Sequence, residues 1–263
     1  MLVEERRQKL SDIVNQRGFV PLPELVVHMG VSESTVRRDL DFLHEAGLVR
    51  RTHGGAMAVA EAAVLPAFDE RTSRQSKEKK KIGQRMANLI QDGETVLLDG
   101  GTTTYEVARH LVGRSLQIVT NSLPIASLLA SSRETDLVLI GGYVYPKTGV
   151  ALGSMAKQAM QELHVHRLIM SVSGVTQRGL YNGNLLLVET ERVMMQCANE
   201  TNVVADHSKF GQQAIAFLDD WSGIHRIVVD DAVTDEQLAM VGSNVEIVIA
   251  GTRGTAAPGQ EKT

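Results

Sequence analysis

The segment 30–43, with the sequence GVSESTVRRDLDFL, constrains the fold of this chain more than any other stretch. Ser32 is a good helix N-cap, because its hydroxyl can accept a hydrogen bond from a backbone N–H two or three residues later. After it, Val36, Leu40 and Leu43 recur at the spacing that lines one apolar face of a helix. The pattern therefore predicts an amphipathic helix.

The opposite side of this helix is basic at its start and acidic toward its end. At about 100° per residue, Ser34 and Arg38 point away from the apolar face, and Arg37 lies on its flank. Asp41 and Glu45 follow on the outward side. Only the first two turns therefore suit a polyanion, which is the arrangement of a helix that enters a DNA groove by its N-terminal end.

Flanking segments complete a winged helix-turn-helix pattern. Residues 3–17 are typical of a first helix, and residues 22–29 of a short helix opened by prolines. Gly30 supplies the positive φ that a tight turn between two helices needs. Residues 47–56 contain a strand pattern, a Gly-Gly turn and a return strand, which predicts a wing. The wing residues expected at DNA phosphates are Arg50, Arg51 and His53.

The run VSESTVRRDLDFLHEAGLVRRTHGGA resembles the DNA-binding domain of the DeoR family of bacterial transcriptional regulators. Its most specific parts are the VS-x-x-TVRRDL core and the RR-x-HGGA that follows. An isolated arginine pair is usually a solvated helix face, but a basic footprint inside a complete motif favours DNA contact. The predicted DNA-binding residues are Ser32, Ser34, Thr35, Arg37, Arg38, Arg50, Arg51 and His53.

Charge limits how such a domain could bind DNA. The 263 residues suffice for two domains, and their net charge is −4. Residues 1–57 hold eight Lys or Arg and eight Asp or Glu, so their balance is zero. Affinity must therefore come from the placement of a few arginines, which predicts a specific binder of double-stranded DNA that acts as a homodimer or homotetramer.

Other features of the sequence limit the cellular compartment that we expect for the protein and the kinds of metal or disulfide site that it can form. The one cysteine, Cys197, excludes a disulfide framework within the chain and a multi-cysteine metal cluster. No apolar stretch approaches about 18 residues and the N-terminal sequence lacks an apolar signal core, so we expect a cytoplasmic protein with no membrane contact. His164 and His166, two residues apart, are a weak metal signal, and no metal site is predicted.

Composition also suggests the domain boundaries. We expect a winged helix-turn-helix over 1–57, a linker over 58–75, an α/β domain over 76–250 and a disordered tail over 251–263. A basic run leads into a helix over 82–90 and is either a solvated face or a supplementary contact with DNA or a ligand phosphate. Its members are Arg71, Arg74, Lys77, Lys79, Lys80, Lys81 and Arg85.

From residue 94 onward, short β-branched runs alternate with amphipathic helical segments, which predicts an α/β domain with a mostly parallel sheet. Strands are expected at 95–98, 117–120, 137–140, 167–172, 201–205, 224–229 and 245–249. Helices are expected at 104–111, 124–130, 154–163, 188–198 and 235–241. In such sheets, ligands bind at the carboxyl ends of the strands.

Loops at three predicted strand ends carry polar residues or glycines. Residues 99–104 lead into a helix, where converging backbone N–H groups and threonine hydroxyls favour a bound phosphate. The alternative is an ordinary strand-to-helix turn without a ligand. Asn121 follows the next strand and could bind a ligand, cap a helix, or do both. Lys209, after a later strand, could reach a ligand phosphate. The sites of close backbone approach elsewhere are Gly141, Gly142 and Gly153.

The strings LDGGTTT, VTNS, IGG and ADHSKFG appear in the order found in the second domain of the DeoR family, so the resemblance covers about residues 3–250. It implies a domain similar to the sugar-phosphate isomerases of the ribose-5-phosphate and glucosamine-6-phosphate type. It also implies that this domain senses a phosphorylated sugar or related metabolite, which alters operator binding. The expected effector-binding residues are Asp99, Gly100, Gly101, Thr102, Thr103, Thr104, Asn121, Gly141, Gly142, Gly153 and Lys209.

One departure from the family pattern bears on catalysis. The isomerases carry an acidic motif after the strand at 167–172, and family regulators often keep an Asp there, whereas residues 171–175 of this chain are SVSGV, with Ser173 in place of the acid. Because enediol chemistry needs a positioned base, this loop predicts a sensor without turnover. Glu189 and Glu191, farther on in a helix, are interpreted as surface or interface charges.

The sequence thus predicts a repressor of a carbohydrate-metabolism operon that a sugar phosphate releases from DNA, with no cofactor. Two alternatives stay open. One is a sugar-phosphate isomerase-like enzyme with an accessory DNA-binding domain. The other is a regulator that senses a nucleotide, because a Gly-rich loop at a helix start also suits a nucleotide phosphate.

Overall fold

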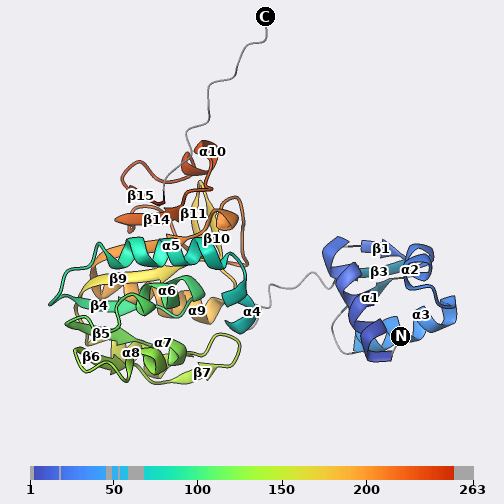
Figure 1. Ribbon diagram of the computed structural model, residues 1–263, viewed down its shortest axis with the longest axis horizontal. Coiled ribbons are helices and arrows are strands. Elements are labelled where there is room, and N and C mark those ends of the chain that lie inside the picture. Colours follow the sequence, from blue (N-terminus) through green and yellow to red (C-terminus); the bar gives the residue numbers. More distant parts are fainter. Residues whose placement is uncertain (1–2, 18, 46–48, 53, 59–67, 252–263) are drawn as a thin grey trace, which may run out of the picture. The chain divides into compact units, whose positions relative to one another are not determined.

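The computed structural model describes residues 3–17, 19–45, 49–52, 54–58 and 68–251. The chain divides into two compact units, Met1–Val64 and Leu65–Thr263 (Figure 1). The boundary between them falls inside the segment expected to be a linker, although residues 68–73 of that segment form a helix.

The first unit is a winged helix-turn-helix. Its elements are α1 (Val3–Arg17), β1 (Phe19–Pro21), α2 (Leu22–Met29), α3 (Glu33–Glu45), β2 (Val49–Thr52) and β3 (Gly55–Ala58). Gly30, at φ +62°, ends α2 in the left-handed conformation that the turn requires. Strands β2 and β3 pair antiparallel and form the predicted wing.

Strand β1 was not predicted, and it extends the wing to a three-stranded sheet in the order β1-β3-β2. A Cβ at Gly55 would lie 2.3 Å from the carbonyl oxygen of Val20, so this position accepts only glycine while β1 lies so close to β3. A strand of three residues carries too little periodicity to be recognised in the sequence.

The core of this unit is formed where the sequence predicted it. Val36, Leu40 and Leu43 of α3 are buried in one cluster with Leu10 and Val14 of α1. The apolar face of α3 is therefore turned inward, and its other side is left for solvent or a partner.

A buried ion pair also holds α3 to α1. Asp39 is 2% exposed and accepts hydrogen bonds from the Nε atoms of Arg6, at 2.6 Å, and Arg7, at 3.0 Å. Arg7 in turn stacks over the ring of Phe42, with 3.7 Å between its guanidinium carbon and the ring centroid. These contacts fix the orientation of α3 on the rest of the unit.

The second unit contains a seven-stranded sheet in the order β15-β14-β12-β9-β4-β5-β6, and every adjacent pair in it is parallel. Its strands are β4 (Thr95–Leu98), β5 (Leu116–Thr120), β6 (Thr135–Leu139), β9 (Val165–Ser171), β12 (Ala198–Ala205), β14 (Arg226–Asp230) and β15 (Glu246–Ala250). Each of the seven predicted strands is one of these. The parallel α/β prediction is therefore confirmed.

Helices cover both faces of this sheet. They are α4 (Phe68–Ser73), α5 (Ser76–Ala87), α6 (Thr102–Arg109), α7 (Leu123–Leu129), α8 (Ser154–Gln161), α9 (Leu185–Gln196) and α10 (Asp235–Leu238). Figure 1 shows α5 and α6 lying across one face. Within β4, Val96 and Leu98 belong to the apolar cluster of α5, α6 and α7, whereas Leu97 belongs to that of α8 and α9. This period-two alternation produces a three-layer core.

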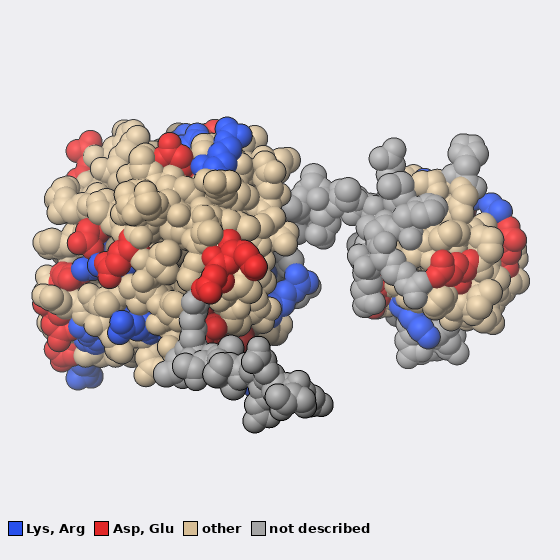
Figure 2. Space-filling model, turned by 90° about the horizontal axis from the view of Figure 1, so that it is seen from above, with Lys and Arg blue, Asp and Glu red and all other residues tan. Residues whose placement is uncertain are grey.

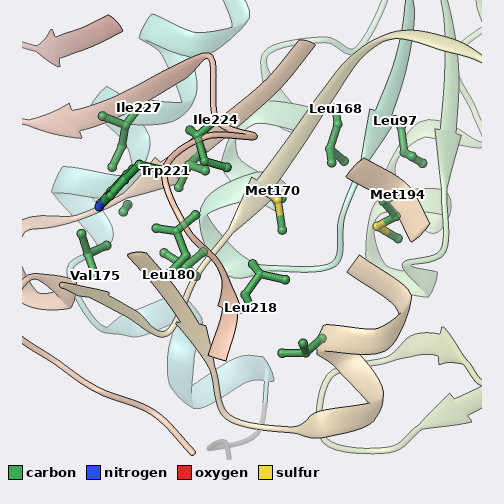
Figure 3. Packing of buried hydrophobic residues seen from close by; sticks show 14 of the residues in the cluster. Leu97, Leu168, Met170, Val175, Leu180, Met194, Leu218, Trp221, Ile224 and Ile227 are labelled. Atoms are coloured by element: carbon green, nitrogen blue, oxygen red, sulfur yellow. The ribbon is translucent and has the colours of Figure 1, made fainter. Parts of the chain in front are cut away.

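The cluster on the α8 and α9 side is shown in Figure 3, where Leu168 and Met170 of the sheet lie near Met194 of α9. Trp221 packs in the same cluster beside Ile227 and donates a hydrogen bond from its Nε1 to the carbonyl of Thr176 at 3.2 Å. Trp221 therefore has a packing role in this cluster.

The small elements of the second unit were not predicted. They are the hairpin β7 (Tyr143–Tyr145) and β8 (Val150–Leu152), and the sheet of β10 (Gly174–Thr176), β11 (Gly179–Asn182) and β13 (Ala216–Asp219). Helix α4 lies in the expected linker, where Phe68 packs edge-on against Tyr105 of α6 with 5.5 Å between ring centroids. No helix among the described residues combines the length and the apolar character needed to cross a membrane.

Candidate nucleic-acid interface and effector site

The start of α3 presents a cluster of hydroxyl groups. The Oγ of Ser32 accepts a hydrogen bond from the backbone N–H of Thr35 at 3.3 Å, as expected of an N-cap. It also lies 3.0 Å from the Oγ of Ser34 and 2.8 Å from the Oγ1 of Thr35. Ser32 and Ser34 are exposed and Thr35 is half-buried, so these hydroxyls lie at the helix end where anions are favoured.

The arginines of α3 and the wing differ in how they are held. Arg37 is exposed and pairs with Glu33, its Nη2 lying 2.6 Å from the Glu33 carboxylate. Arg51 of β2 pairs with Asp41 of α3. Arg38 is exposed and has no ion pair with any described residue. Of these three, Arg38 is the one whose guanidinium needs no exchange of partner to meet DNA.

Two predicted wing residues fall outside this comparison. The backbone of Arg50 belongs to β2, but its side chain lies outside the described part of the structure. His53 lies outside the described residues altogether. Figure 2 shows Lys and Arg side chains interspersed with Asp and Glu on the visible faces, consistent with DNA affinity that depends on placement and not on net charge.

In the second unit, the strand order reverses between β4 and β9. From β4 the chain builds outward through β5 and β6, and from β9 it builds the other way through β12, β14 and β15. Ligands of open parallel sheets bind outside the carboxyl ends of the strands at such a switch point. Asp99 directly follows β4, and Ser171 ends β9 with its backbone N–H donating to the Oδ2 of Asp99 at 3.4 Å. The topology therefore places a candidate site at Asp99.

The loop after Asp99 leads into α6 without a break. Thr102 and Thr103 form the first turn of α6, and their side chains make no hydrogen bond with any described residue. The hydroxyl of Thr104 is already used, because it donates to the carbonyl of Gly101 at 2.8 Å and accepts from the N–H of Gly101 at 2.7 Å. The free N–H groups and hydroxyls at this end thus come from Thr102 and Thr103, while Thr104 shapes the loop.

Gly100 and Gly101 are required by packing against neighbouring strands. A Cβ at Gly100 would lie 1.8 Å from Cγ1 of Val150 in β8, and one at Gly101 would lie 1.8 Å from Oγ of Ser171 in β9. The two glycines let the loop sit directly on these strands.

In the side-chain amide of Asn121, the nitrogen makes a hydrogen bond and the oxygen makes none with any described residue. Its Nδ2 donates to the carbonyl of Ala151 at 3.0 Å, while its Oδ1 is buried and meets no hydrogen-bond partner among the described residues. The cap of α7 is provided by Ser122, whose Oγ accepts from the N–H of Ile125, so the capping alternative for Asn121 is wrong. A buried acceptor without a donor is costly unless a ligand or water supplies one.

The remaining predicted glycines lie around the β7–β8 hairpin. Gly141 and Gly142 follow β6, and a Cβ at Gly142 would lie 2.9 Å from the carbonyl oxygen of Leu152. Gly153, at φ +90°, is the N-cap of α8. For Gly142, the close approach is to protein backbone.

Lys79, one member of the predicted basic run, is a buried residue of α5. Lys79 of α5 is 4% exposed, and its Nζ donates hydrogen bonds to the carbonyls of Arg71 and Arg74. Burial lowers its pKa to about 8, and the neighbouring charges are Asp206, Lys209, Arg71 and Glu106. The charge of Lys209, which ends the short helix His207–Lys209 after β12, also acts to lower the pKa of Lys79.

The position of Lys79 follows from close helix packing. Gly83, one turn later on α5, lies so near α6 that a Cβ there would be 2.6 Å from the carbonyl carbon of Glu106. The sequence signal for Lys79 was therefore its spacing of four residues from a helical glycine, which places both on the same face.

Glu191 corrects an interpretation made from the sequence. It is 2% exposed, not a surface charge, and its Oε1 accepts a hydrogen bond from Nδ2 of Asn182 at 2.6 Å. The same Asn182 accepts through its Oδ1 from the Oγ of Ser173 at 2.8 Å. Glu189, in contrast, is exposed and pairs with Lys157 at 2.8 Å, as expected of a surface residue. Because an α-helix has about 3.6 residues per turn, residues two positions apart lie on nearly opposite faces, so Glu191 faces the core and Glu189 faces solvent.

Glu191 and Asp99 are electrostatic neighbours. Burial, and then the charge of Asp99, raise the pKa of Glu191 well above its usual value. Burial also raises the pKa of Asp99 to about 6, against the opposing effect of hydrogen bonds from Gly100 and Ser171 and the charge of Arg71. The loop at 171–175 has no acid of its own, but a carboxyl from α9 reaches the same surroundings through Asn182.

A winged helix-turn-helix joined to a parallel α/β unit with a polar site at its switch point defines a ligand-responsive DNA-binding regulator. Residues 6–62 match the family model of the DeoR-like helix-turn-helix domain, and residues 74–231 match that of the DeoR C terminal sensor domain. The chain belongs to the DeoR family of transcriptional regulators.

Curated relatives extend over most of the chain. The glycerol-3-phosphate regulon repressor of Escherichia coli (strain K12) is 32% identical over 228 residues, which cover 86% of this chain and 90% of that protein. The HTH-type transcriptional regulator IolR of Bacillus subtilis (strain 168) is 31% identical and covers 88% of this chain and 92% of its own length. These relatives are regulators, in agreement with the prediction of a non-enzymatic protein.

A solved structure similar to this chain is ribose 5-phosphate isomerase A from Methanocaldococcus jannaschii. The TM-score is 0.38 at 20% sequence identity, and the match covers 51% of this chain and 54% of that one.

Proposed function

We propose that this regulator represses a carbohydrate-metabolism operon and that a phosphorylated sugar or related metabolite, bound in the second unit, releases it from its operator. The observation that carries the effector part is the buried ammonium of Lys79 on α5, a helix that packs closely on α6 and has Lys209 as an electrostatic neighbour. Two ammonium groups and the N-terminal N–H groups of a helix favour an anion of high charge density. The name of the relative from Escherichia coli, which cites a glycerol-3-phosphate regulon, points to the same class of ligand.

In this proposal the phosphate lies against residues 100–103, and the hydroxyls of the effector reach Asn121 and Asp99. Asn121 Oδ1 is a buried acceptor that a hydroxyl can satisfy, and Asp99 is an acceptor at the switch point. Lys79 joins the set expected from the sequence, which is Asp99, Gly100, Gly101, Thr102, Thr103, Thr104, Asn121, Gly141, Gly142, Gly153 and Lys209.

On the DNA side, α3 enters the major groove by its N-terminal end. Arg38 is the side chain proposed to read a base edge, Ser34 contributes a further base contact, and Arg51 contacts a phosphate after leaving Asp41. One small wing and helix make few phosphate contacts, so operator binding requires a homodimer or homotetramer that presents two such units. The operator is then a double-stranded site with two related halves, read in the cytoplasm.

The effector part is tested by thermal denaturation of the full-length protein with sugar phosphates, the same sugars without phosphate, and nucleotides. A ligand at about 100 times its Kd stabilises a protein by about 2.7 kcal/mol, so a true effector gives a clear shift. We expect a sugar phosphate to stabilise the protein and to release operator DNA in a gel-shift assay. Stabilisation by nucleotides alone would support the nucleotide sensor instead.

A pair of matched variants tests whether the response to the effector depends on the proposed phosphate site. Lys79→Gln removes the buried ammonium, whereas Lys80→Gln removes an exposed one from the next position of α5. The proposal expects the effector response to be lost in the first variant and kept in the second. Equal responses in both would show that the phosphate binds elsewhere.

A further inference from the structure

The first described helix after the DNA-binding unit carries an arginine with two buried N–H donors that no described residue accepts. Arg71 lies on α4, the first described element after residue 58. Its Nε and Nη2 atoms are buried and meet no hydrogen-bond partner among the described residues. Leaving two donors of a guanidinium unsatisfied in a protein interior is unfavourable, because water solvated them before folding.

The surroundings of Arg71 are those of the effector site. Its guanidinium is attracted by Asp99, which directly follows β4, and burial lowers its pKa in spite of that attraction. Asp99 nevertheless accepts no hydrogen bond from Arg71 in the described structure. Lys79 Nζ donates a hydrogen bond to the backbone carbonyl of Arg71, so the side chain of one cationic residue contacts the backbone of the other.

Helix α4 is anchored on the sensor unit through its other residues. Phe68 packs on Tyr105 of α6, with 5.5 Å between the ring centroids, and the Arg71 guanidinium lies 5.9 Å from the Phe68 ring. Lys79 donates to the carbonyl of Arg74 at 2.6 Å, just beyond the end of α4. A few contacts thus set the orientation of α4, and two of them are the hydrogen bonds that Lys79 Nζ donates to the carbonyls of Arg71 and Arg74.

We propose that Arg71 binds the anionic group of the effector, so that α4 is itself part of the effector site. The planar fork of a guanidinium offers two parallel N–H donors, which match two oxygens of a phosphate monoester. The bound anion satisfies Nε and Nη2 and bridges α4 to the start of α6. This inference rests on the proposed function, because it assigns a further residue to the same site.

A consequence for regulation follows from the place of α4 in the chain. Because α4 is the first described helix of the second unit, an anion that binds Arg71 holds α4 in its place on the sensor unit. Effector binding and the ordering of α4 are then linked, and each changes the equilibrium of the other by the same factor.

The test compares Arg71→Gln with Arg74→Gln in the full-length protein. Arg74 is exposed and lies three residues away, so the second variant makes the same change of charge outside the site. The probe is inorganic phosphate, titrated against chloride at constant ionic strength, with thermal denaturation as the readout. We expect wild type and Arg74→Gln to bind phosphate alike, and Arg71→Gln to bind about ten- to a hundred-fold more weakly, as for the loss of charged hydrogen bonds.

A second readout separates binding from a general loss of structure. Amide hydrogen exchange across 68–74 should slow on addition of phosphate in wild type and Arg74→Gln, and stay unchanged in Arg71→Gln. Without phosphate, Arg71→Gln should melt no lower than wild type, because it removes two buried N–H donors that no described residue accepts. If that variant does not fold, Arg71→Lys serves in its place, because it keeps the charge but lacks the two parallel N–H donors of the guanidinium. It should still bind phosphate more weakly than wild type.

The outcomes distinguish this inference from the proposed function. Wild-type affinity for phosphate in both Arg71 variants, with affinity lost in Lys79→Gln, overturns the role of Arg71 and leaves the effector site in place. Absence of any response to phosphate or sugar phosphates in wild type overturns the proposed function, and this inference with it.

Discussion

At the scale of single residues, Arg38 differs from the other arginines of the DNA-binding unit. Arg37 and Arg51 are held by Glu33 and Asp41, whereas Arg38 is exposed and unpaired within the described structure. Surface pairs contribute little, so DNA phosphates can replace the carboxylates at low cost. Base recognition, however, is best served by a side chain that has no competing partner.

We therefore predict that Arg38→Ala weakens specific operator binding by about 1–3 kcal/mol, as for loss of a bidentate base contact. The measurement is titration of the variant against operator and random DNA at one salt concentration. Arg37→Ala is the control and should weaken binding to both DNAs by similar, smaller amounts. An equal loss on both DNAs for Arg38→Ala would identify it as a phosphate contact.

Glu191 gives a second residue-scale prediction, because a buried acid responds to pH in a known direction. Its pKa is raised in the folded protein by burial and by Asp99, from an ordinary value of 4.5. Below that value both the folded and unfolded states are protonated. Above it the unfolded state ionises first, so this residue makes the fold progressively less stable as pH rises.

Glu191→Gln cannot ionise, and we expect its melting temperature to rise relative to wild type between pH 5 and pH 8. The matched control is Glu189→Gln on the same helix, where an exposed pair with Lys157 lowers the pKa of the carboxyl. That control should show no such rise. A constant difference between Glu191→Gln and wild type across the range would contradict the buried-acid assignment.

At the scale of elements, the attachment of α3 to α1 decides whether the DNA-reading helix is held firmly. Burial alone would raise the pKa of Asp39, but hydrogen bonds from Arg6 and Arg7 outweigh it and leave the pKa below its usual value. A carboxyl of lowered pKa stabilises the fold above the unfolded-state value of 3.8 and loses that contribution as pH falls further.

Asp39→Asn should lower the free energy of unfolding of this unit by about 2 kcal/mol, because two guanidinium groups lose a charged acceptor. Asp41→Asn, which breaks only the half-buried, solvent-accessible pair with Arg51, should cost less than about 1 kcal/mol. Chemical denaturation at pH 7 and pH 3 measures both. The deficit of Asp39→Asn should shrink at the lower pH, because the carboxyl of the unfolded state takes up a proton first and wild type then loses part of this stabilisation.

At the scale of the whole molecule, the two units have separate cores. The cluster of Leu10, Leu25 and Leu40 contains residues of the first unit alone, and the clusters around the seven-stranded sheet contain residues of the second alone. Stability added by a ligand of the sensor unit should therefore appear in that unit.

Calorimetry should show two unfolding transitions, of which inorganic phosphate raises only the larger. The larger belongs to Leu65–Thr263, because unfolding enthalpy scales with the number of residues. Operator DNA in place of phosphate should raise the smaller transition. A single transition raised equally by either ligand would mean that the units unfold together.

The sequence by itself determined the elements, because their signals are local. The apolar spacing of Val36, Leu40 and Leu43 set the buried face of α3, and Gly30 set the turn before it. Seven short β-branched runs marked the seven strands of the sheet. A family resemblance in the loops indicated where a ligand would bind, and the switch point falls at one of those loops.

The tertiary structure decided which charged residues meet. Arg71 and Glu191 are charged like many surface residues, and no local pattern marks them as electrostatic neighbours of Asp99. Their positions depend on strands β4 and β9 being adjacent in the sheet although they are far apart in the chain, on the packing of α9 against β9, and on the packing of α4 and α5 against α6. Periodicity reports the face that a residue occupies on its own element, whereas the neighbours of that face depend on the order of strands, which only the folded chain establishes.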